Sequence, residues 1–166
     1  MRPPFFLAVL LSFFCIAAGA QRLDFLGMKD ISFGMKAADL PGKTVILDST
    51  SSYHDTATYL RNTRCPMYFR SGENLALNGF TASRIEYEFC DNLLTYVFVY
   101  VSGKTEIEKA LNELKKTFTK LGCKGKSLSE CTQMDASAKG IRIIINIDRQ
   151  KQLMNFVLIT KKGAGR

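Results

Sequence analysis

The chain has 166 residues, of which 46% are apolar, and its twelve Phe and six Tyr are enough to build the core of one domain. This composition excludes a disordered chain and a fibrous protein. The formal net charge is +8, and it is unevenly distributed. Residues 103–166 contain 14 Lys and Arg against 6 Asp and Glu, whereas residues 21–102 contain 8 against 9. The C-terminal part therefore suits an anionic partner surface, unless its lysines serve only solubility. No aromatic residue is interleaved with these bases, so a nucleic acid is not expected as partner.

Residues 1–20 have the pattern of a secretory signal peptide. Arg2 precedes an apolar run at 5–18, and Ala18-Gly19-Ala20 offers the small residues of a cleavage site. The apolar run is too short to span a membrane well, and no second long apolar stretch follows it, so no transmembrane segment is expected after signal removal. We expect a secreted or periplasmic protein with one domain at 21–160 and a basic flexible tail at 161–166.

Four cysteines follow the signal, at positions 65, 90, 123 and 131. An even number in an oxidising compartment predicts two disulfides, for which three pairings exist. We favour Cys65 with Cys90, because this bond would staple the strand at 65–70 to the next hairpin. We also favour Cys123 with Cys131, because this bond would close a short polar loop after the helix. A four-cysteine zinc site is the alternative, but no C-x-x-C knuckle exists, so neither a metal nor another cofactor is expected.

Before the central hairpin, the pattern is irregular. Residues 34–40 resemble one or two helical turns that stop at Pro41-Gly42, and 44–47 is a short strand candidate. Residues 48–58 are polar and indicate a loop. Residues 65–70 indicate a strand with Pro66 at its start, 71–74 a turn, and 79–83 the approach to the hairpin.

The central hairpin begins with strict alternation at 84–90. The face with Ile85, Tyr87 and Phe89 is predicted to be buried. The opposite face, with Arg84, Glu86 and Glu88, is predicted to be exposed to water. Glu86 and Glu88 could form a carboxylate pair, but an ordinary wet sheet face with Arg84 and Arg142 as ion partners is favoured. Asp91-Asn92 tolerates the positive φ of a type I′ turn, which predicts an antiparallel hairpin.

The return strand at 93–101 carries no charge on either face, which predicts a central strand covered on both sides. Tyr96, Phe98 and Tyr100 form an aromatic ladder on one of these faces. The ladder is interpreted as core under a helix or loop. If it faces water instead, it marks a partner or ligand site, with Tyr96 and Tyr100 as binding residues.

An amphipathic helix is predicted at about 105–121. Thr105 and Glu108 match a capping box, an apolar stripe runs from Ile107 to Leu121, and Gly122 suits a left-handed stop. The outer face is basic, and we treat it as the first candidate binding surface, with Lys109, Lys116 and Lys120 as its residues.

Residues 123–140 are polar and indicate a loop. Strands at 141–147 and 153–160 then form a second hairpin, in which Ile141, Ile143, Ile145 and Ile147 face inward. The predicted fold class is α+β, a two-layer arrangement of a mainly antiparallel sheet packed against one long helix.

Two segments carry a resemblance to known families. Gly34-Met35 followed by Leu40, and the strand 85–89 with its Asp-Asn turn and apolar return strand, resemble small exported bacterial modules that open on an F-G-M-S/T-x-x-x-[VL] turn. The outer-membrane assembly lipoproteins and the modules of the β-lactamase-inhibitor protein share this style. Lys36 replaces their small hydroxyl residue, and the lipid anchor is missing. The resemblance implies a non-catalytic protein-binding module and transfers no functional residue.

No catalytic residue is assigned. Gly103-Lys104-Thr105 lies between a strand and a helix, but Phe98 stands where a phosphate-binding loop needs its first glycine. His54 is the single histidine, and neighbours in one loop do not form a triad. We therefore expect an exported, disulfide-stapled protein-interaction module of the cell envelope or extracellular space, with an envelope protein or an anionic surface as partner. The alternative is a small hydrolase or ligand-binding protein with a cleft near Ser49–Asp55.

Overall fold

A computed structural model describes residues 21–46, 65–122 and 131–160. The predicted signal peptide, the Ser49–Asp55 segment with His54, Cys123 and the basic tail lie outside the described residues. The elements of the described part, in chain order, are β1 (Arg22–Leu23), η1 (Asp24–Leu26), β2 (Met28–Ser32), η2 (Ala37–Asp39), β3 (Lys43–Ile46), β4 (Met67–Ser71), β5 (Ala76–Leu77), β6 (Phe80–Thr81), β7 (Arg84–Cys90), β8 (Leu93–Ser102), α1 (Lys104–Thr117), β9 (Gln133–Ala138), β10 (Ile141–Asp148) and β11 (Leu153–Thr160).

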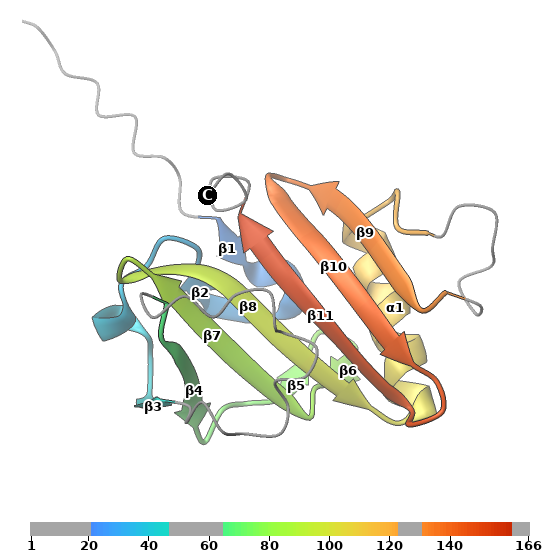
Figure 1. The fold of residues 1–166 in the computed structure, drawn as a ribbon, viewed down its shortest axis with the longest axis horizontal. Helices are drawn as coiled ribbons and strands as arrows, with labels where there is room; N and C mark the ends of the chain where they lie inside the picture. Colours follow the sequence, from blue (N-terminus) through green and yellow to red (C-terminus); the bar gives the residue numbers. More distant parts are fainter. Residues whose placement is uncertain (1–20, 47–64, 123–130, 161–166) are drawn as a thin grey trace, which may run out of the picture.

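Seven of these strands form one antiparallel sheet in the order β3-β4-β7-β8-β11-β10-β9. Two further pairs, β1–β2 and β5–β6, are separate two-stranded sheets. Figure 1 shows α1 behind the β9–β10–β11 half of the large sheet and the two small sheets on the same side, behind the other half. The fold is therefore α+β with two layers, which confirms the predicted fold class.

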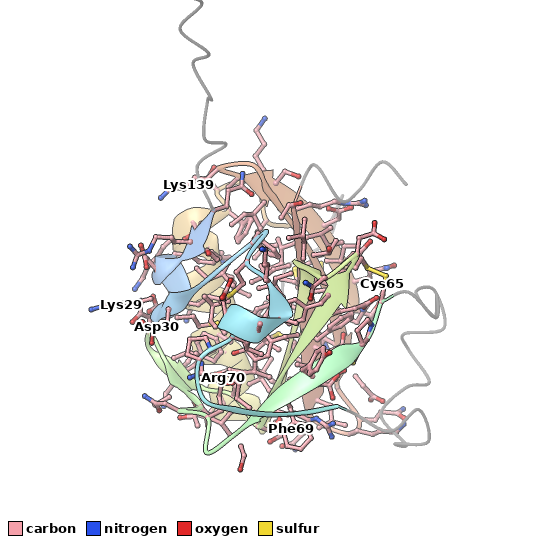
Figure 2. The ribbon with its side chains drawn as sticks, turned by 90° about the vertical axis from the view of Figure 1, so that its left-hand side faces the viewer. Lys29, Asp30, Cys65, Phe69, Arg70 and Lys139 are labelled. Atoms are coloured by element: carbon pink, nitrogen blue, oxygen red, sulfur yellow. A yellow bond between two sulfur atoms is a disulfide. The ribbon has the colours of Figure 1, made fainter. Side chains whose placement is uncertain are left out.

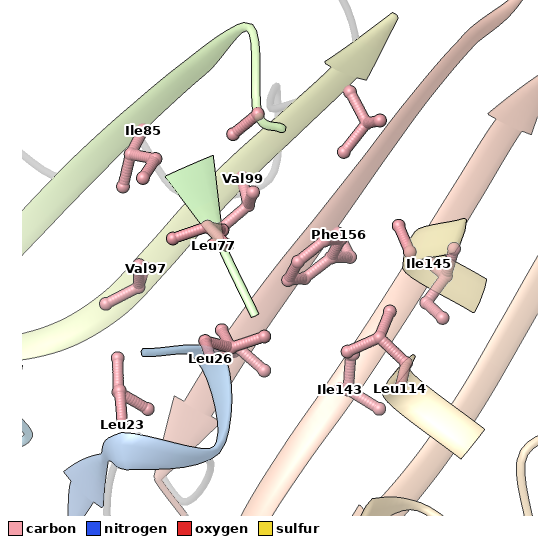
Figure 3. Close-up of a cluster of buried hydrophobic side chains, with 14 of the residues drawn as sticks. Leu23, Leu26, Leu77, Ile85, Val97, Val99, Leu114, Ile143, Ile145 and Phe156 are labelled. Carbon is pink, nitrogen blue, oxygen red and sulfur yellow. The ribbon is translucent and has the colours of Figure 1, made fainter. Parts of the chain in front are cut away.

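The core lies between these two layers. The face of the large sheet that points into it carries Val97, Val99 and Val101 of β8, all 0% exposed, and we call it the valine face. Leu114 of α1 is also 0% exposed, and Figure 3 shows it with Val97 and Val99 in one buried cluster. The predicted inward positions of β10 belong to the same core and are buried, namely Ile141, Ile143, Ile145 and Ile147. Alternation with a period of two residues explains why one side of each strand is apolar.

The central hairpin forms as predicted. β7 and β8 pair antiparallel, and the turn residues Asp91 and Asn92 have φ values of 52° and 63°. Both angles lie in the left-handed region that a type I′ turn requires. The pairing shifts register between Glu88 and Phe89.

The second hairpin, β10–β11, also forms, but the predicted loop at 123–140 is wrong over part of its length. Residues 133–138 are strand β9, which pairs antiparallel with β10 from Gln133 to Ala138. Met134 and Ala136 are buried, and the tight turn uses Lys139 and Gly140 at φ 49° and 76°. Small and polar residues weaken the strand signal, so β9 depends on the isoleucine-rich strand beside it.

The helix differs from its prediction at both ends. Gly103 occupies the N-cap position and no side chain caps the helix, so Thr105 and Glu108 form no capping box. Glu106 instead accepts a hydrogen bond from the backbone N–H of Thr81 at 2.6 Å. The helix ends at Thr117, because Phe118 leaves the helical path and turns into the core, where it is 1% exposed. Gly122 is not in the left-handed conformation that the predicted stop required.

Two short features lie outside the large sheet and α1. The β5–β6 hairpin occupies a stretch that the sequence indicated only as an approach to β7, while η2 matches the predicted turns before Pro41. Phe80 of β6 is 4% exposed and makes an edge contact with Phe156 of β11, with ring centroids 6.3 Å apart. The small hairpin is therefore held by its packing on the sheet.

Candidate binding site

A pocket of about 480 Å³ lies between α1 and the end of β10. This volume is within the range of about 300 to 1,000 Å³ that ligand pockets occupy. The pocket is lined by one side of the helix, by Ile147 near the end of β10 and by two residues of the β10–β11 turn. The lining residues are Lys104, Ile107, Glu108, Leu111, Asn112, Lys115, Ile147, Arg149 and Gln152.

The floor of this pocket is apolar and its rim is basic. Ile107, Leu111 and Ile147 are 6%, 8% and 5% exposed, so they form a buried floor. The rim carries exposed Lys104, Lys115 and Arg149 against one acid, Glu108. The helical spacing of 104, 108, 111 and 115 explains why these side chains share one side of α1. A basic rim above an apolar floor suits a ligand that joins a carboxylate to an apolar group.

Arg149 is held at the pocket by a contact with the backbone. Its Nη2 donates a hydrogen bond to the backbone carbonyl of Cys131 at 3.0 Å, and Cys131 is 1% exposed and disulfide-bonded. This hydrogen bond orients the guanidinium at the pocket. A positioned guanidinium loses less conformational entropy on binding an anion than a free one.

The basic surface predicted from the sequence lies on another part of the helix. Lys109 pairs with Glu106 at 2.7 Å and Lys116 with Glu113 at 2.6 Å, while Lys120 follows the helix and is exposed. Two of the three predicted cations are thus partly neutralised by acids on the same helix. The sequence contained a signal for the better site, since Lys104 and Lys115 flank the apolar stripe on the other side.

The face opposite the valine face carries the aromatic ladder, so the ladder does not lie under α1. We call the group formed by Glu86, Glu88, Tyr96, Phe98 and Tyr100 the acidic–aromatic face. Phe98 is 4% exposed, whereas Tyr96 and Tyr100 are partly exposed. The predicted binding residues Tyr96 and Tyr100 therefore lie together, although away from the pocket.

The predicted wet face of β7 is wrong, because Glu86 is 1% and Glu88 is 2% exposed. Glu86 has a cation on one side and a hydrogen-bond donor on the other, although its Oε1 accepts no hydrogen bond of good geometry among the described residues. Arg84 Nε lies 2.6 Å from its Oε1, and the Tyr100 hydroxyl donates to its Oε2 at 3.0 Å. Burial, followed by the nearby Glu86 carboxylate, raises the pKa of Tyr100 above its usual value. Buried carboxylates persist where such partners exist.

Glu88 lacks comparable partners among the described residues. Its Oε2 has no hydrogen-bond donor, and its Oε1 lies 3.8 Å from Cys90 Sγ. That sulfur is in a disulfide and has no proton to donate. Burial raises the pKa of Glu88 to about 7, and no cation in the described part of the chain counteracts this effect.

Cys65 and Cys90 are joined in a disulfide, the first of the two predicted pairs, with Cα atoms 4.1 Å apart. Figure 2 shows Cys65 at the outer edge of the molecule. The potential metal-ligand atoms of Cys65, Glu88 and Cys90 lie within 4.8 Å of one another. However, two sulfurs that are joined in a disulfide are not thiolates and do not bind a metal ion as thiolates do. This group is therefore not a metal centre in the oxidised protein. The second predicted pair involves Cys123, which lies outside the described residues.

A second buried polar cluster lies at the β4 side of the core. The Tyr87 hydroxyl donates to Glu73 at 2.9 Å, and Arg70 pairs with the same carboxylate at 2.9 Å. Figure 2 labels Arg70 beside Phe69 on this side of the sheet. Burial raises the pKa of Glu73, although Tyr87 and Arg70 act in the opposite direction. The mutual hydrogen bonding of the three side chains indicates a structural role.

No helix in the described part of the chain is long and apolar enough to cross a membrane. Comparison with known proteins gave no match among family models, curated proteins or solved structures. The resemblance to exported bacterial binding modules therefore stays a prediction. The Ser49–Asp55 cleft of the alternative function lies outside the described residues.

Proposed function

We propose that the protein is a non-catalytic protein-interaction module that binds an acidic, partly apolar segment of another protein in the pocket between α1 and β10. The observation that carries this proposal is the pocket itself, with three cations on its rim and three buried apolar side chains on its floor. The occupant that fits is an extended segment in which a Glu or Asp stands next to a Leu or Phe. The carboxylate would meet Lys104, Lys115 and Arg149, and the apolar side chain would cover Ile107 and Leu111.

The compartment of this function is part of the proposal. The Cys65–Cys90 bond and the disulfide at Cys131 favour an oxidising compartment, and the sequence of residues 1–20 favours export. We therefore place the binding module in the cell envelope or the extracellular space. Intact-mass measurement of the exported protein tests the processing, since cleavage should leave Gln21 as the first residue.

The binding site is tested with two charge-reversal variants that change the net charge equally. The pocket variant carries Lys104→Glu, Lys115→Glu and Arg149→Glu, and the control carries Lys109→Glu, Lys116→Glu and Lys120→Glu. The probe is a fluorescent peptide that alternates Glu with Leu, and its Kd is measured by fluorescence polarisation. A peptide with Gln in place of Glu measures binding without the charge.

The pocket variant should weaken binding of the acidic peptide at least about tenfold, and the control variant less than about threefold. Circular dichroism melting should show that both variants fold. Equal weakening by the two variants would mean that only the net charge matters, which contradicts the proposal. Weakening by the control alone would move the site to the outer helix face. Weakening only in a Tyr96→Ala variant would move it to the acidic–aromatic face.

A further inference from the structure

The chain places a buried carboxyl group directly beside its solvent-accessible disulfide. Strand alternation puts Glu86, Glu88 and Cys90 on the same face of β7, because they are two residues apart. Glu88 lies opposite Met67 of β4, and Cys65 precedes this strand and is bonded to Cys90. The carboxyl oxygen and the two sulfurs all lie within 4.8 Å of one another. The two sheet strands therefore hold these three groups together.

Glu88 does not stabilise the fold in any way that its contacts show. It is 2% exposed, and its Oε2 has no donor. Its Oε1 faces the sulfur of Cys90 at 3.8 Å. Glu86, which is equally buried on the same face, has Arg84 and Tyr100 as partners. A buried carboxyl group without a partner is costly, so its position beside the disulfide calls for a chemical explanation.

We propose that Cys65, Cys90 and Glu88 form a thiol–disulfide exchange site that oxidises a dithiol of another molecule, with Glu88 as the proton donor. Both cysteines are partly exposed, so an external thiolate can reach the bond. The thiolate attacks Sγ of Cys65, a mixed disulfide forms, and the bond between the two cysteines breaks. Cys90 Sγ leaves with the electron pair and takes the proton of the Glu88 carboxyl group.

The second step completes the two-electron balance. The remaining thiol of the dithiol loses its proton to water and attacks the sulfur of its own molecule in the mixed disulfide. Cys65 Sγ leaves and takes a proton from water, and the Glu88 carboxylate regains its proton from water. The external dithiol has become a disulfide, and Cys65 and Cys90 have become thiols.

The surroundings of Glu88 suit a proton donor near neutral pH. Burial raises its pKa to about 7. The titratable groups beside it on this face are Tyr96, which lies opposite on β8, and Glu86, which lies two residues along β7. Met67 opposite it on β4 carries no charge. The carboxyl group therefore keeps its proton over much of the acidic and neutral range and faces the leaving sulfur.

The test is the rate at which dithiothreitol reduces the Cys65–Cys90 bond in the full-length folded protein, followed by alkylation and peptide mass spectrometry between pH 6 and 8.5. The variant is Glu88→Gln and the matched control is Glu86→Gln, an equally buried glutamate on the same strand face. The unfolding rate of the same protein, followed by circular dichroism after transfer into urea and extrapolated to water, is the reference for reduction by unfolding.

In the wild type, the Cys65–Cys90 bond should be reduced much faster than the protein unfolds. The rate per dithiothreitol thiolate should fall as the pH rises through about 7, where Glu88 loses its proton. Glu88→Gln should slow the reaction at pH 6 about tenfold or more and abolish this pH dependence, and Glu86→Gln should keep it.

The proposal is overturned if the wild-type reduction rate, expressed per dithiothreitol thiolate, does not change with pH. This measurement needs no variant, so it also decides the question if Glu88→Gln fails to fold. Equal reduction rates in the wild type and Glu88→Gln would also overturn it. Reduction of the Cys65–Cys90 bond at the unfolding rate would show that the bond opens only when the protein unfolds, and would leave Cys65–Cys90 as a structural staple.

Discussion

The two faces of the seven-stranded sheet bury their residues by different means. On the valine face, α1, β1–β2 and β5–β6 cover apolar side chains, and the free energy comes from removing hydrocarbon from water. On the acidic–aromatic face, Glu86 and Glu88 are as deeply buried as the valines. There, burial depends on whether each polar atom finds a partner. Two glutamates on one strand, two residues apart, thus have different environments, because Glu86 has an ion pair and a hydrogen bond and Glu88 has neither among the described residues.

The comparison predicts that the largest loss of stability comes from the apolar side. Phe118 is 1% exposed and makes an edge contact with Phe25, with ring centroids 5.8 Å apart. Phe118→Ala should lower the free energy of unfolding by about 3 to 5 kcal/mol, because it removes a large side chain and leaves a cavity. Urea denaturation measures this difference. Lys116→Ala, at an exposed ion pair with Glu113, is the control and should cost within about 0.5 kcal/mol. A similar small cost for Phe118→Ala would mean that the end of α1 does not pack on the core.

On the other face, Glu88→Gln should make the protein more stable at high pH. The folded protein holds a proton on Glu88 up to about pH 7, whereas the unfolded chain loses it near the ordinary value of 4.5. Between these two values the unfolded state binds fewer protons, so the stability of the wild type falls as the pH rises. The penalty is absent below about pH 4 and complete above about pH 7, where it amounts to about 3 kcal/mol.

Denaturation curves at pH 4, 6 and 8 measure this effect. The variant should equal the wild type at pH 4, apart from a constant offset, and exceed it increasingly at pH 6 and 8. Glu108→Gln, on the exposed surface of α1, is the control and should follow the wild type at each pH. A constant difference between Glu88→Gln and the wild type at all three pH values would show that Glu88 ionises normally in the folded protein.

A smaller effect is expected for Tyr100→Phe. The substitution keeps the ring and removes the hydroxyl that donates to Glu86 at 3.0 Å. A hydrogen bond to a charged acceptor contributes about 1.5 to 3 kcal/mol, and Arg84 remains as the second partner of Glu86, so the cost should lie toward the lower value. Thermal unfolding of both proteins measures it. Tyr96→Phe is the matched control on the same strand face, and an equal loss in the two variants would argue against the Glu86 contact.

The sequence predicts the elements whose pattern is local. The hairpin around Asp91-Asn92, the hairpin β10–β11 and the apolar stripe of α1 all follow from side-chain periodicity and turn chemistry. Strand β9 was missed because Ala136 and Ala138 give a weak apolar signal. The helix end was misplaced because the apolar stripe continues through Phe118 and Leu121, although the chain has already left the helix there.

The candidate sites depend on neighbours that are distant in the sequence. Alternation places Glu86 and Glu88 on one face, but it predicts that this face is wet, and it cannot show that Tyr100 arrives from β8 to hold one of them. The pocket likewise joins Lys104 and Lys115 to Arg149, which belongs to the β10–β11 turn. The Cys65–Cys90 pair was accessible to sequence reasoning, whereas the position of Glu88 beside it required the register of β4 on β7.

The polar pairs of β9, β10 and β11 also decide how these strands align. The four isoleucines of β10 are identical along the valine face, so sliding this strand by two residues would still place isoleucine against the core. A shift in either direction would separate Asn146 from Asn155, whose side chains hydrogen-bond at 3.1 Å, and the shift that carries Arg142 away from Asp135 would also break their ion pair. Together with the tight turns, the polar side of the sheet therefore specifies one alignment among several that the apolar side would accept.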